Sequence, residues 1–119
     1  MAGTVESPAI CDARRGRLSH DQRAARPALG LAGASEVTTQ VWVDDWRLSL
    51  EGSTYIAQIP ARDYTLDLKL AAGKPPLLHG DAGFSRKGTR PGEASYYYSR
   101  PNLAVHGSVN GQAVTGTAW

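Results

Sequence analysis

Residues 46–59 read WRLSLEGSTYIAQI, and one set of apolar residues occupies every second position on both sides of Gly52-Ser53. This period of two is typical of strands that bury one face. A glycine at the first position of a two-residue loop favours a type II′ turn between antiparallel strands. In that register three pairs face one another: Leu50 with Tyr55, Leu48 with Ala57, and Trp46 with Ile59. Turn type and register therefore agree in predicting a hairpin.

The alternation extends on both sides of this hairpin. Residues 37–43 predict a preceding strand, with Trp42 on its second face. After a short link at 61–63, residues 64–70 place Tyr and Leu at every second position and predict the next strand. The two prolines in 73–76 cannot donate to a sheet ladder, so this strand is expected to end before them.

The last third of the chain predicts a further strand and a second hairpin. Residues 96–98 read YYY, a strand in which Tyr96 and Tyr98 share a face. Asn110-Gly111 is the dipeptide that a type I′ turn requires. Its register pairs Val109 with Gln112, Gly107 with Val114, Val105 with Gly116 and Leu103 with Ala118. One face of this hairpin is therefore apolar, while His106 and Trp119 lie on the other.

These strands predict an all-β fold, an antiparallel meander of the kind that closes into a barrel or folds over as a sandwich. Residues 1–35 are rich in Ala, Gly and Arg, and are expected to form an irregular N-terminal arm. Within this arm, 14–25 could form a short helix, although its apolar positions make no continuous stripe. The β domain is expected over 36–119.

Composition excludes several classes of protein. The chain of 119 residues has a net charge of +2, and its basic residues are scattered apart from Arg14, Arg15 and Arg17, so we expect no nucleic-acid partner. The single cysteine, Cys11, excludes an internal disulfide, and no Cys/His cluster has zinc-ligand spacing. We expect no cofactor and no metal. There is no signal-peptide pattern and no apolar run long enough for a transmembrane segment, and the localisation stays open.

Five motifs together resemble a known family: GRLSHDQR at 16–23, GLAGAS at 30–35, VWVDDW at 41–46, LHGDAGFSRKG at 78–88 and ASYYYS at 94–99. They resemble the carotenoid 1,2-hydratase-like (hydroxyneurosporene synthase-like) lipocalin family, whose bacterial members are often described as predicted secreted hydrolases. The resemblance implies two lipocalin-like barrels beside a site for apolar molecules. The chain covers the back part of the first barrel, so the fold is expected to be a partial lipocalin-like barrel.

Family members carry earlier strands with a Glu-Trp-Trp-Tyr type motif, and continue after the equivalent of Thr117-Ala118-Trp119 with an acidic, His- and Trp-containing stretch and a second barrel. By this resemblance we expect the chain to be a fragment of a longer protein, with exposed strand edges that favour self-association. Relatives are often exported or associated with membranes.

The candidate site residues follow from the chemistry of that family. Hydration of an isolated alkene requires a proton donor, π faces or carboxylates that stabilise a carbocation, and a positioned water molecule. His79 and Asp81 are the candidate acid/base pair, although their position beside Gly80 and Gly83 favours the alternative that they fix a turn through side-chain to backbone hydrogen bonds. Ligand binding is assigned to aromatic side chains and one lysine: Trp42, Tyr96, Tyr98, Lys87 and Trp119.

Each of these assignments has an alternative. The tyrosines could serve in core packing, Lys87 could be an exposed lysine at a strand end, and His20 with Asp21 is expected to form a surface ion pair with Arg23. Two functions stay open. The first is a fragment of a hydratase-family enzyme that handles an apolar lipid or isoprenoid substrate without its full catalytic machinery. The second is a non-catalytic module for binding an apolar ligand or another chain.

Overall fold

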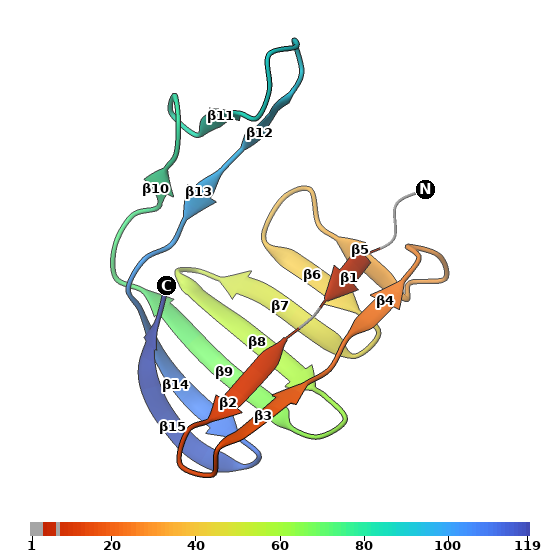
Figure 1. The fold of residues 1–119 in the computed structure, drawn as a ribbon, viewed down its shortest axis with the longest axis vertical. Coiled ribbons are helices and arrows are strands. Elements are labelled where there is room, and N and C mark those ends of the chain that lie inside the picture. The colour runs from red at the N-terminus through yellow and green to blue at the C-terminus, as the bar shows by residue number, and fades with distance from the viewer. Residues whose placement is uncertain (1–3, 7) are drawn as a thin grey trace.

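The computed structural model describes residues 4–6 and 8–119, and these form strands, turns and loops without a helix. A strongly curved antiparallel sheet of seven strands dominates the fold (Figure 1), in the order β15-β14-β9-β8-β7-β6-β5. Its strands are β5 (Ala32–Ala34), β6 (Gln40–Val43), β7 (Trp46–Glu51), β8 (Thr54–Pro60), β9 (Thr65–Ala72), β14 (Leu103–Val109) and β15 (Gln112–Ala118). The predicted antiparallel meander is confirmed. The sheet does not close into a barrel, since β5 and β15 remain its two edges.

Both predicted hairpins have the expected turns and registers. Gly52 has φ of +61°, as the first position of a type II′ turn requires, and Leu50 pairs with Tyr55 across β7 and β8. Asn110 and Gly111 have φ of +52° and +74°, which a type I′ turn requires at both positions. Across that turn Val109 pairs with Gln112, and the pairing continues in register as far as Leu103 and Ala118. Local turn chemistry therefore fixes both pairings.

The N-terminal segment is more regular than expected. β1 (Thr4–Glu6) pairs with β4 (Arg23–Ala25), and β2 (Ala9–Asp12) pairs with β3 (Arg17–His20), so that the chain from β1 to β4 is one long bent hairpin. The helix considered for 14–25 is wrong, because this stretch contains a turn and two strands. In Figure 1 this N-terminal hairpin crosses the concave side of the curved sheet.

The strand predicted for 37–43 is shorter than expected. It begins at Gln40, and the preceding residues form bends. The Ser35 hydroxyl oxygen accepts a hydrogen bond from the Val37 backbone N–H at 3.2 Å, which turns the chain, and the Val37 side chain is 95% exposed. A side-chain bond to the local backbone competes here with the sheet ladder.

Between β9 and β14 the chain makes a projecting arm, residues 77–99. β10 (Leu77–Leu78) pairs with β13 (Tyr98–Ser99), and β11 (Phe84–Arg86) pairs with β12 (Ala94–Tyr96). Figure 1 shows this arm extending away from the sheet. The strand predicted for the tyrosine run is interrupted at Tyr97, which lies between β12 and β13.

Few side chains are fully buried. From Pro8 onward, the buried apolar residues are Ala32, Val43, Trp46, Tyr55, Tyr64 and Leu103. Most side chains on the apolar face of the sheet keep an intermediate exposure instead. Within the described residues, no helix is long and apolar enough to cross a membrane.

Candidate functional site

The concave face of the sheet carries one continuous set of apolar side chains. The strand pairings place Leu48 beside Ala57, Ala57 beside Leu68, and Leu68 beside Gly107. Because side chains alternate between the two faces of a strand, every second residue of each strand joins this set. Besides Trp46 and Leu103, its larger members are Leu48, Leu50, Tyr55, Ile59, Leu66, Leu68, Leu70, Val105, Val109 and Val114. We call this surface the concave apolar face.

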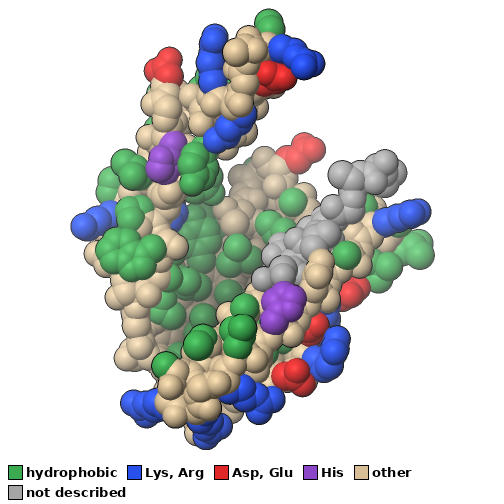
Figure 2. All heavy atoms as spheres, viewed as in Figure 1, with side chains coloured by type: hydrophobic (Ala, Val, Ile, Leu, Met, Phe, Trp, Pro, Cys, Tyr) green, Lys and Arg blue, Asp and Glu red, His purple; other side chains and the backbone are tan. Residues whose placement is uncertain are grey.

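The concave apolar face is hollow and only partly covered. Figure 2 shows hydrophobic side chains gathered in a depression between the sheet and the N-terminal hairpin. Leu48 is 38% exposed, and Leu66, Leu68 and Leu70 on β9 are half-buried. A pocket of about 120 Å³ lies against Val41, Leu48 and Ile59. Side chains of this kind in the middle of a sheet are normally buried by a second layer.

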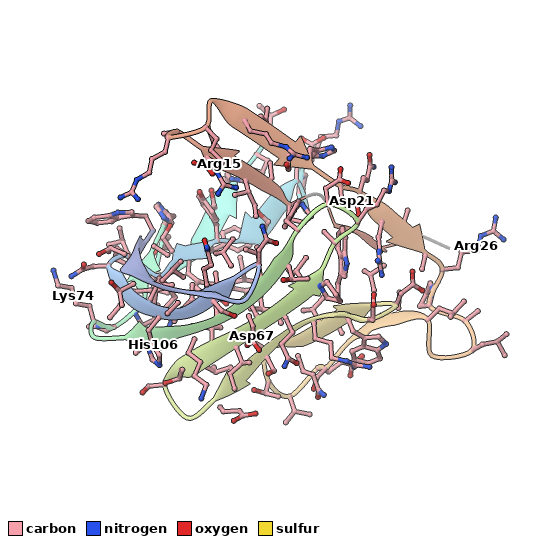
Figure 3. The ribbon with its side chains drawn as sticks, turned by 90° about the horizontal axis from the view of Figure 1, so that it is seen from below. Arg15, Asp21, Arg26, Asp67, Lys74 and His106 are labelled. Atoms are coloured by element: carbon pink, nitrogen blue, oxygen red, sulfur yellow. The ribbon has the colours of Figure 1, made fainter. Side chains whose placement is uncertain are left out.

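One fixed attachment of the N-terminal hairpin is the buried carboxylate of Asp21. It accepts hydrogen bonds from the backbone N–H groups of Gln22, at 2.8 Å, and Arg62, at 3.0 Å. These two backbone donors, and then the Arg62 guanidinium, hold the pKa of Asp21 below its ordinary value of 3.8. Figure 3 shows Asp21 where the hairpin meets the loop between β8 and β9.

The predicted surface ion pair of Asp21 with Arg23 is therefore wrong. The ion-pair partner of Asp21 is Arg62, at 3.5 Å, and Arg23 pairs with Asp45 instead. Asp21 lies in the link between β3 and β4, and Arg23 begins β4, so the two side chains meet different loops of the sheet. Asp21 and Arg23 thus attach the hairpin to the sheet at two different places, Asp21 at Arg62 and Arg23 at Asp45.

Tyr64 adds a second contact at the same junction. Its ring is buried, and its hydroxyl donates to the Pro8 carbonyl oxygen at 2.8 Å. Burial, and the negative charge of Asp21 nearby, raise the pKa of the Tyr64 hydroxyl above its ordinary value of 10.0. Tyr64 therefore connects the residue before β9 to Pro8, the residue before β2.

The other attachment is built on Trp46. Its ring is 2% exposed and lies 4.7 Å below the Arg23 guanidinium. The Trp46 indole N–H and the Arg23 Nη2 both donate to the Pro60 carbonyl oxygen, each at 3.2 Å. A cation over an indole face is favourable, and more so when water is excluded. Both attachments therefore hold the hairpin at the same end of β8, beside Pro60 and Arg62.

The candidate acid/base residues lie on the arm, away from the concave apolar face. The His79 ring stacks on Tyr97 with 4.2 Å between centroids, and its Nε2 lies 2.7 Å from the Ser99 hydroxyl. Asp81 forms a tight turn with Phe84 through two backbone hydrogen bonds. Among the residues that the structure describes, neither a hydrogen bond nor an ion pair joins His79 to Asp81. Asp81 thus lies in a turn closed by backbone hydrogen bonds, whereas the His79 side chain contacts Tyr97 and Ser99.

Three of the five candidate ligand-binding residues also belong to the arm. Tyr96 is 85% exposed and meets Phe84 edge to face, and Tyr98 lies opposite Leu78. The Lys87 ammonium group lies 4.9 Å from the centre of the Tyr97 ring. The arm thus carries an exposed aromatic surface of its own.

The remaining two lie elsewhere. Trp42 pairs with Gly33 and Arg47, on the opposite face of the sheet from Val41 and Val43. Its indole N–H donates to the Gly30 carbonyl oxygen at 2.9 Å, so it packs the outer edge of the sheet. Trp119 follows β15 and is exposed. Of the five, Trp42 contributes to the lining of the pocket of about 120 Å³ beside Val41 and Leu48, from the edge of the sheet, and the other four do not.

Sequence reasoning missed the residues that attach the hairpin. Asp21 and Arg62 are 41 positions apart, and Tyr64 and Pro8 are 56 apart. No local pattern connects such positions. The signal available was weak: an acidic residue within a segment expected to be irregular, and a tyrosine that begins the predicted strand 64–70. No cluster of three or more metal-ligating side chains occurs in the part of the chain that the structure describes.

A model of the AttH-like protein family matches residues 4–119 of this chain. The chain belongs to the AttH-like family. Among solved structures, this AttH-like chain is similar to the crystal structure of a protein from Nitrosomonas europaea assigned to AttH, with a TM-score of 0.83 and 41% sequence identity. The match covers 97% of this chain and 38% of the other, so the chain spans about two fifths of that relative. No curated protein matches it.

Proposed function

We propose that this AttH-like chain binds an apolar small molecule, a lipid or an isoprenoid, on the concave apolar face. The observation that carries the proposal is the half-buried row of isoleucine, leucine and valine side chains along β8, β9 and β14. Removing apolar surface from water stabilises by about 25 cal/mol per Å². A curved sheet that leaves such a row uncovered gains free energy from an apolar ligand of matching length, and ligand sites are commonly concave and lined by apolar side chains.

Binding without catalysis is the function that the geometry supports best. The finer proposal, a fragment of a carotenoid 1,2-hydratase-like enzyme, rests on the sequence motifs and adds His79 and Asp81 as acid and base. Because the contacts of His79 are with Ser99 and Tyr97, any acid/base role for it is separate from the concave apolar face. A His79→Ala variant that keeps full ligand affinity would agree with binding alone.

The test of binding uses the neutral fluorescent dye N-phenyl-1-naphthylamine, whose emission rises in apolar surroundings. Leu68→Gln places a polar group in the centre of the concave apolar face, and Lys69→Gln changes its neighbour on the opposite face. We expect the first variant to lose dye affinity by about tenfold or more and the second to keep it.

A second variant tests the same face without a buried polar group, so that the test does not depend on the folding of Leu68→Gln. Gly116 lies beside Val105 on the concave side, and a Cβ atom there would meet no heavy atom within 4 Å. Gly116→Leu therefore fills part of the hollow without a polar group, and we expect it to weaken dye binding while the circular dichroism spectrum is retained. Equal affinity in Gly116→Leu, Leu68→Gln and the unsubstituted chain would contradict the proposal.

The ligand-binding roles of the arm remain a separate proposal. If Tyr96, Tyr98 and Lys87 contact the ligand, then the double variant Tyr96→Ser/Tyr98→Ser and the variant Lys87→Gln weaken dye binding. Trp42→Phe and Trp119→Ser provide the same test for the other two residues. Unchanged affinity in all four variants would restrict the site to the concave apolar face.

A further inference from the structure

A second hollow lies at one end of the concave apolar face, under the turn between β2 and β3. Its volume is about 700 Å³, and it opens between this turn and the ends of β9, β14 and β15. Tyr64, Val109 and Val114 supply apolar lining from the sheet side, and the last two also belong to the concave apolar face. Figure 3 shows the hairpin on one side of the sheet, with Arg15 near its turn, and Asp67 and His106 on the other side. The hollow therefore continues the apolar face toward the hairpin.

The lining on the hairpin side is basic. Arg14, Arg15 and Arg17 all line the hollow. They are the one cluster of basic residues in the sequence, and no function has been given to them so far. The opposing charges in the lining are Asp12 and Asp63, so the lining carries a net positive charge.

The turn holds these arginines in a defined arrangement. One carboxylate oxygen of Asp12 accepts hydrogen bonds from the backbone N–H groups of Arg14, at 3.1 Å, and Arg15, at 3.2 Å. The same carboxylate lies 3.7 Å from the Arg15 side chain, so its charge is already engaged. Among the side chains that the structure describes, no carboxylate lies within ion-pair distance of Arg14 or Arg17. The guanidinium groups of Arg14 and Arg17 are thus outside these ion pairs, although Asp12 lies opposite Arg17 in the pairing of β2 with β3.

We propose that this hollow binds the head group of an anionic amphiphile, a carboxylate or a phosphate monoester, whose apolar chain lies along the concave apolar face. The inference rests on the proposed function and specifies its ligand. Guanidinium groups bind both kinds of anion through paired N–H donors. Arg14 and Arg17 would contact the head group, while Tyr64, Val109 and Val114 contact the first part of the chain.

The competing position for a head group is the other end of the sheet. There the Arg100 guanidinium lies 6.0 Å from the centre of the Tyr55 ring, and its Nε is buried without a hydrogen-bond partner. Tyr55 lies at the end of the concave apolar face where Leu103 begins β14, whereas the arginine turn lies at the end where Val109 finishes it. Substitution of Arg100 therefore distinguishes the two ends.

The experiment measures displacement of N-phenyl-1-naphthylamine by dodecanoate, dodecyl phosphate and dodecanol, which share one chain and differ in head group. Three variants are compared: Arg14→Gln/Arg17→Gln, Arg100→Gln, and the control Arg26→Gln/Arg86→Gln, which removes the same two charges from other parts of the surface. We expect the unsubstituted chain and the control to prefer the anions over dodecanol by about tenfold. Arg14→Gln/Arg17→Gln should remove that preference and leave dodecanol affinity unchanged. The ratio of dodecanoate to dodecyl phosphate identifies the head group.

Cys11 reports the position of the ligand, because it is the single cysteine of the chain and lines the same hollow. We expect dodecanoate to slow its alkylation by iodoacetamide. Equal binding of dodecanoate and dodecanol, or loss of the preference in Arg100→Gln alone, would overturn the head-group assignment and leave the apolar site intact. If neither the dye nor any of the three amphiphiles binds, the proposed function fails, and this inference fails with it.

Discussion

The carboxylate of Asp21 illustrates how one residue attaches a segment to the sheet. Its two backbone donors come from Gln22 and Arg62, so it connects the hairpin to the loop after β8. Because its folded pKa lies below the ordinary value, the ionised form is the one that stabilises the fold. This contribution is present above the unfolded pKa of the carboxyl group and is lost as the pH falls through the folded pKa.

We therefore predict that Asp21→Asn lowers the melting temperature at neutral pH. We also predict that the melting temperature of the variant falls less steeply as the pH is lowered. Thermal unfolding followed by circular dichroism from about pH 7 to about pH 3 measures both effects. The difference between the variant and the unsubstituted chain should shrink toward the acidic end of the series. A difference that stays constant with pH would show that the ionised carboxylate is not the stabilising form.

The Tyr64 hydroxyl provides a second prediction at this scale. Tyr64→Phe removes the donor to the Pro8 carbonyl and should cost about 1 kcal/mol of unfolding free energy. Urea denaturation measures this loss of unfolding free energy. The matched control is Tyr98→Phe on the arm, where the ring is 51% exposed and the same change should cost close to nothing. Equal losses in the two variants would contradict the assigned hydrogen bond.

Single-residue roles were the least predictable part of the molecule. Asp21 was expected at the surface beside Arg23, and it is buried with a partner 41 positions away. The Trp42 ring, expected to contact the ligand, lies on the outer face against Gly33. Such roles depend on which segments meet in space, and a single sequence does not contain that information.

The elements of the sheet follow from the sequence far better. The hairpins β7–β8 and β14–β15 have the predicted turns and registers, because Gly52-Ser53 and Asn110-Gly111 have strong local turn preferences. The N-terminal strands were not predicted, because they are short and their pattern is interrupted by Gly16 and Pro8. The fold class was therefore predictable from turn chemistry, whereas the covering hairpin was not.

The pairing of β5 with β6 depends on a close approach of one glycine to one ring. A Cβ atom at Gly33 would lie 2.5 Å from the Trp42 ring, so Gly33→Ala forces the indole to move. We predict a loss of about 1–3 kcal/mol of unfolding free energy, measured by urea denaturation. Gly116→Ala on β15, where the added atom meets nothing within 4 Å, should be neutral or stabilise by up to about 1 kcal/mol. The account of this edge is wrong if Gly33→Ala is as stable as Gly116→Ala.

At the scale of the whole molecule, the open sheet leaves two edges. β15 pairs with β14 alone and presents unpaired backbone groups along its outer side. We predict concentration-dependent self-association, detected as a rising mass in size-exclusion chromatography with light scattering. Thr115→Lys/Thr117→Lys places charges along β15 and should reduce the association, since charged side chains block edge pairing. A monomer at every concentration would contradict this prediction.

The central claim is that an apolar ligand lies on the concave apolar face, and a methyl NMR titration tests it most directly. Leu68, Leu70, Val105 and Val114 report on that face, while Leu77 and Leu78 on the arm and Val37 on the outer surface are internal controls. With dodecanol as ligand, we predict saturable shifts of the first group and unchanged signals from the controls. Shifts confined to Leu77 and Leu78, or no shifts at all, would contradict the account.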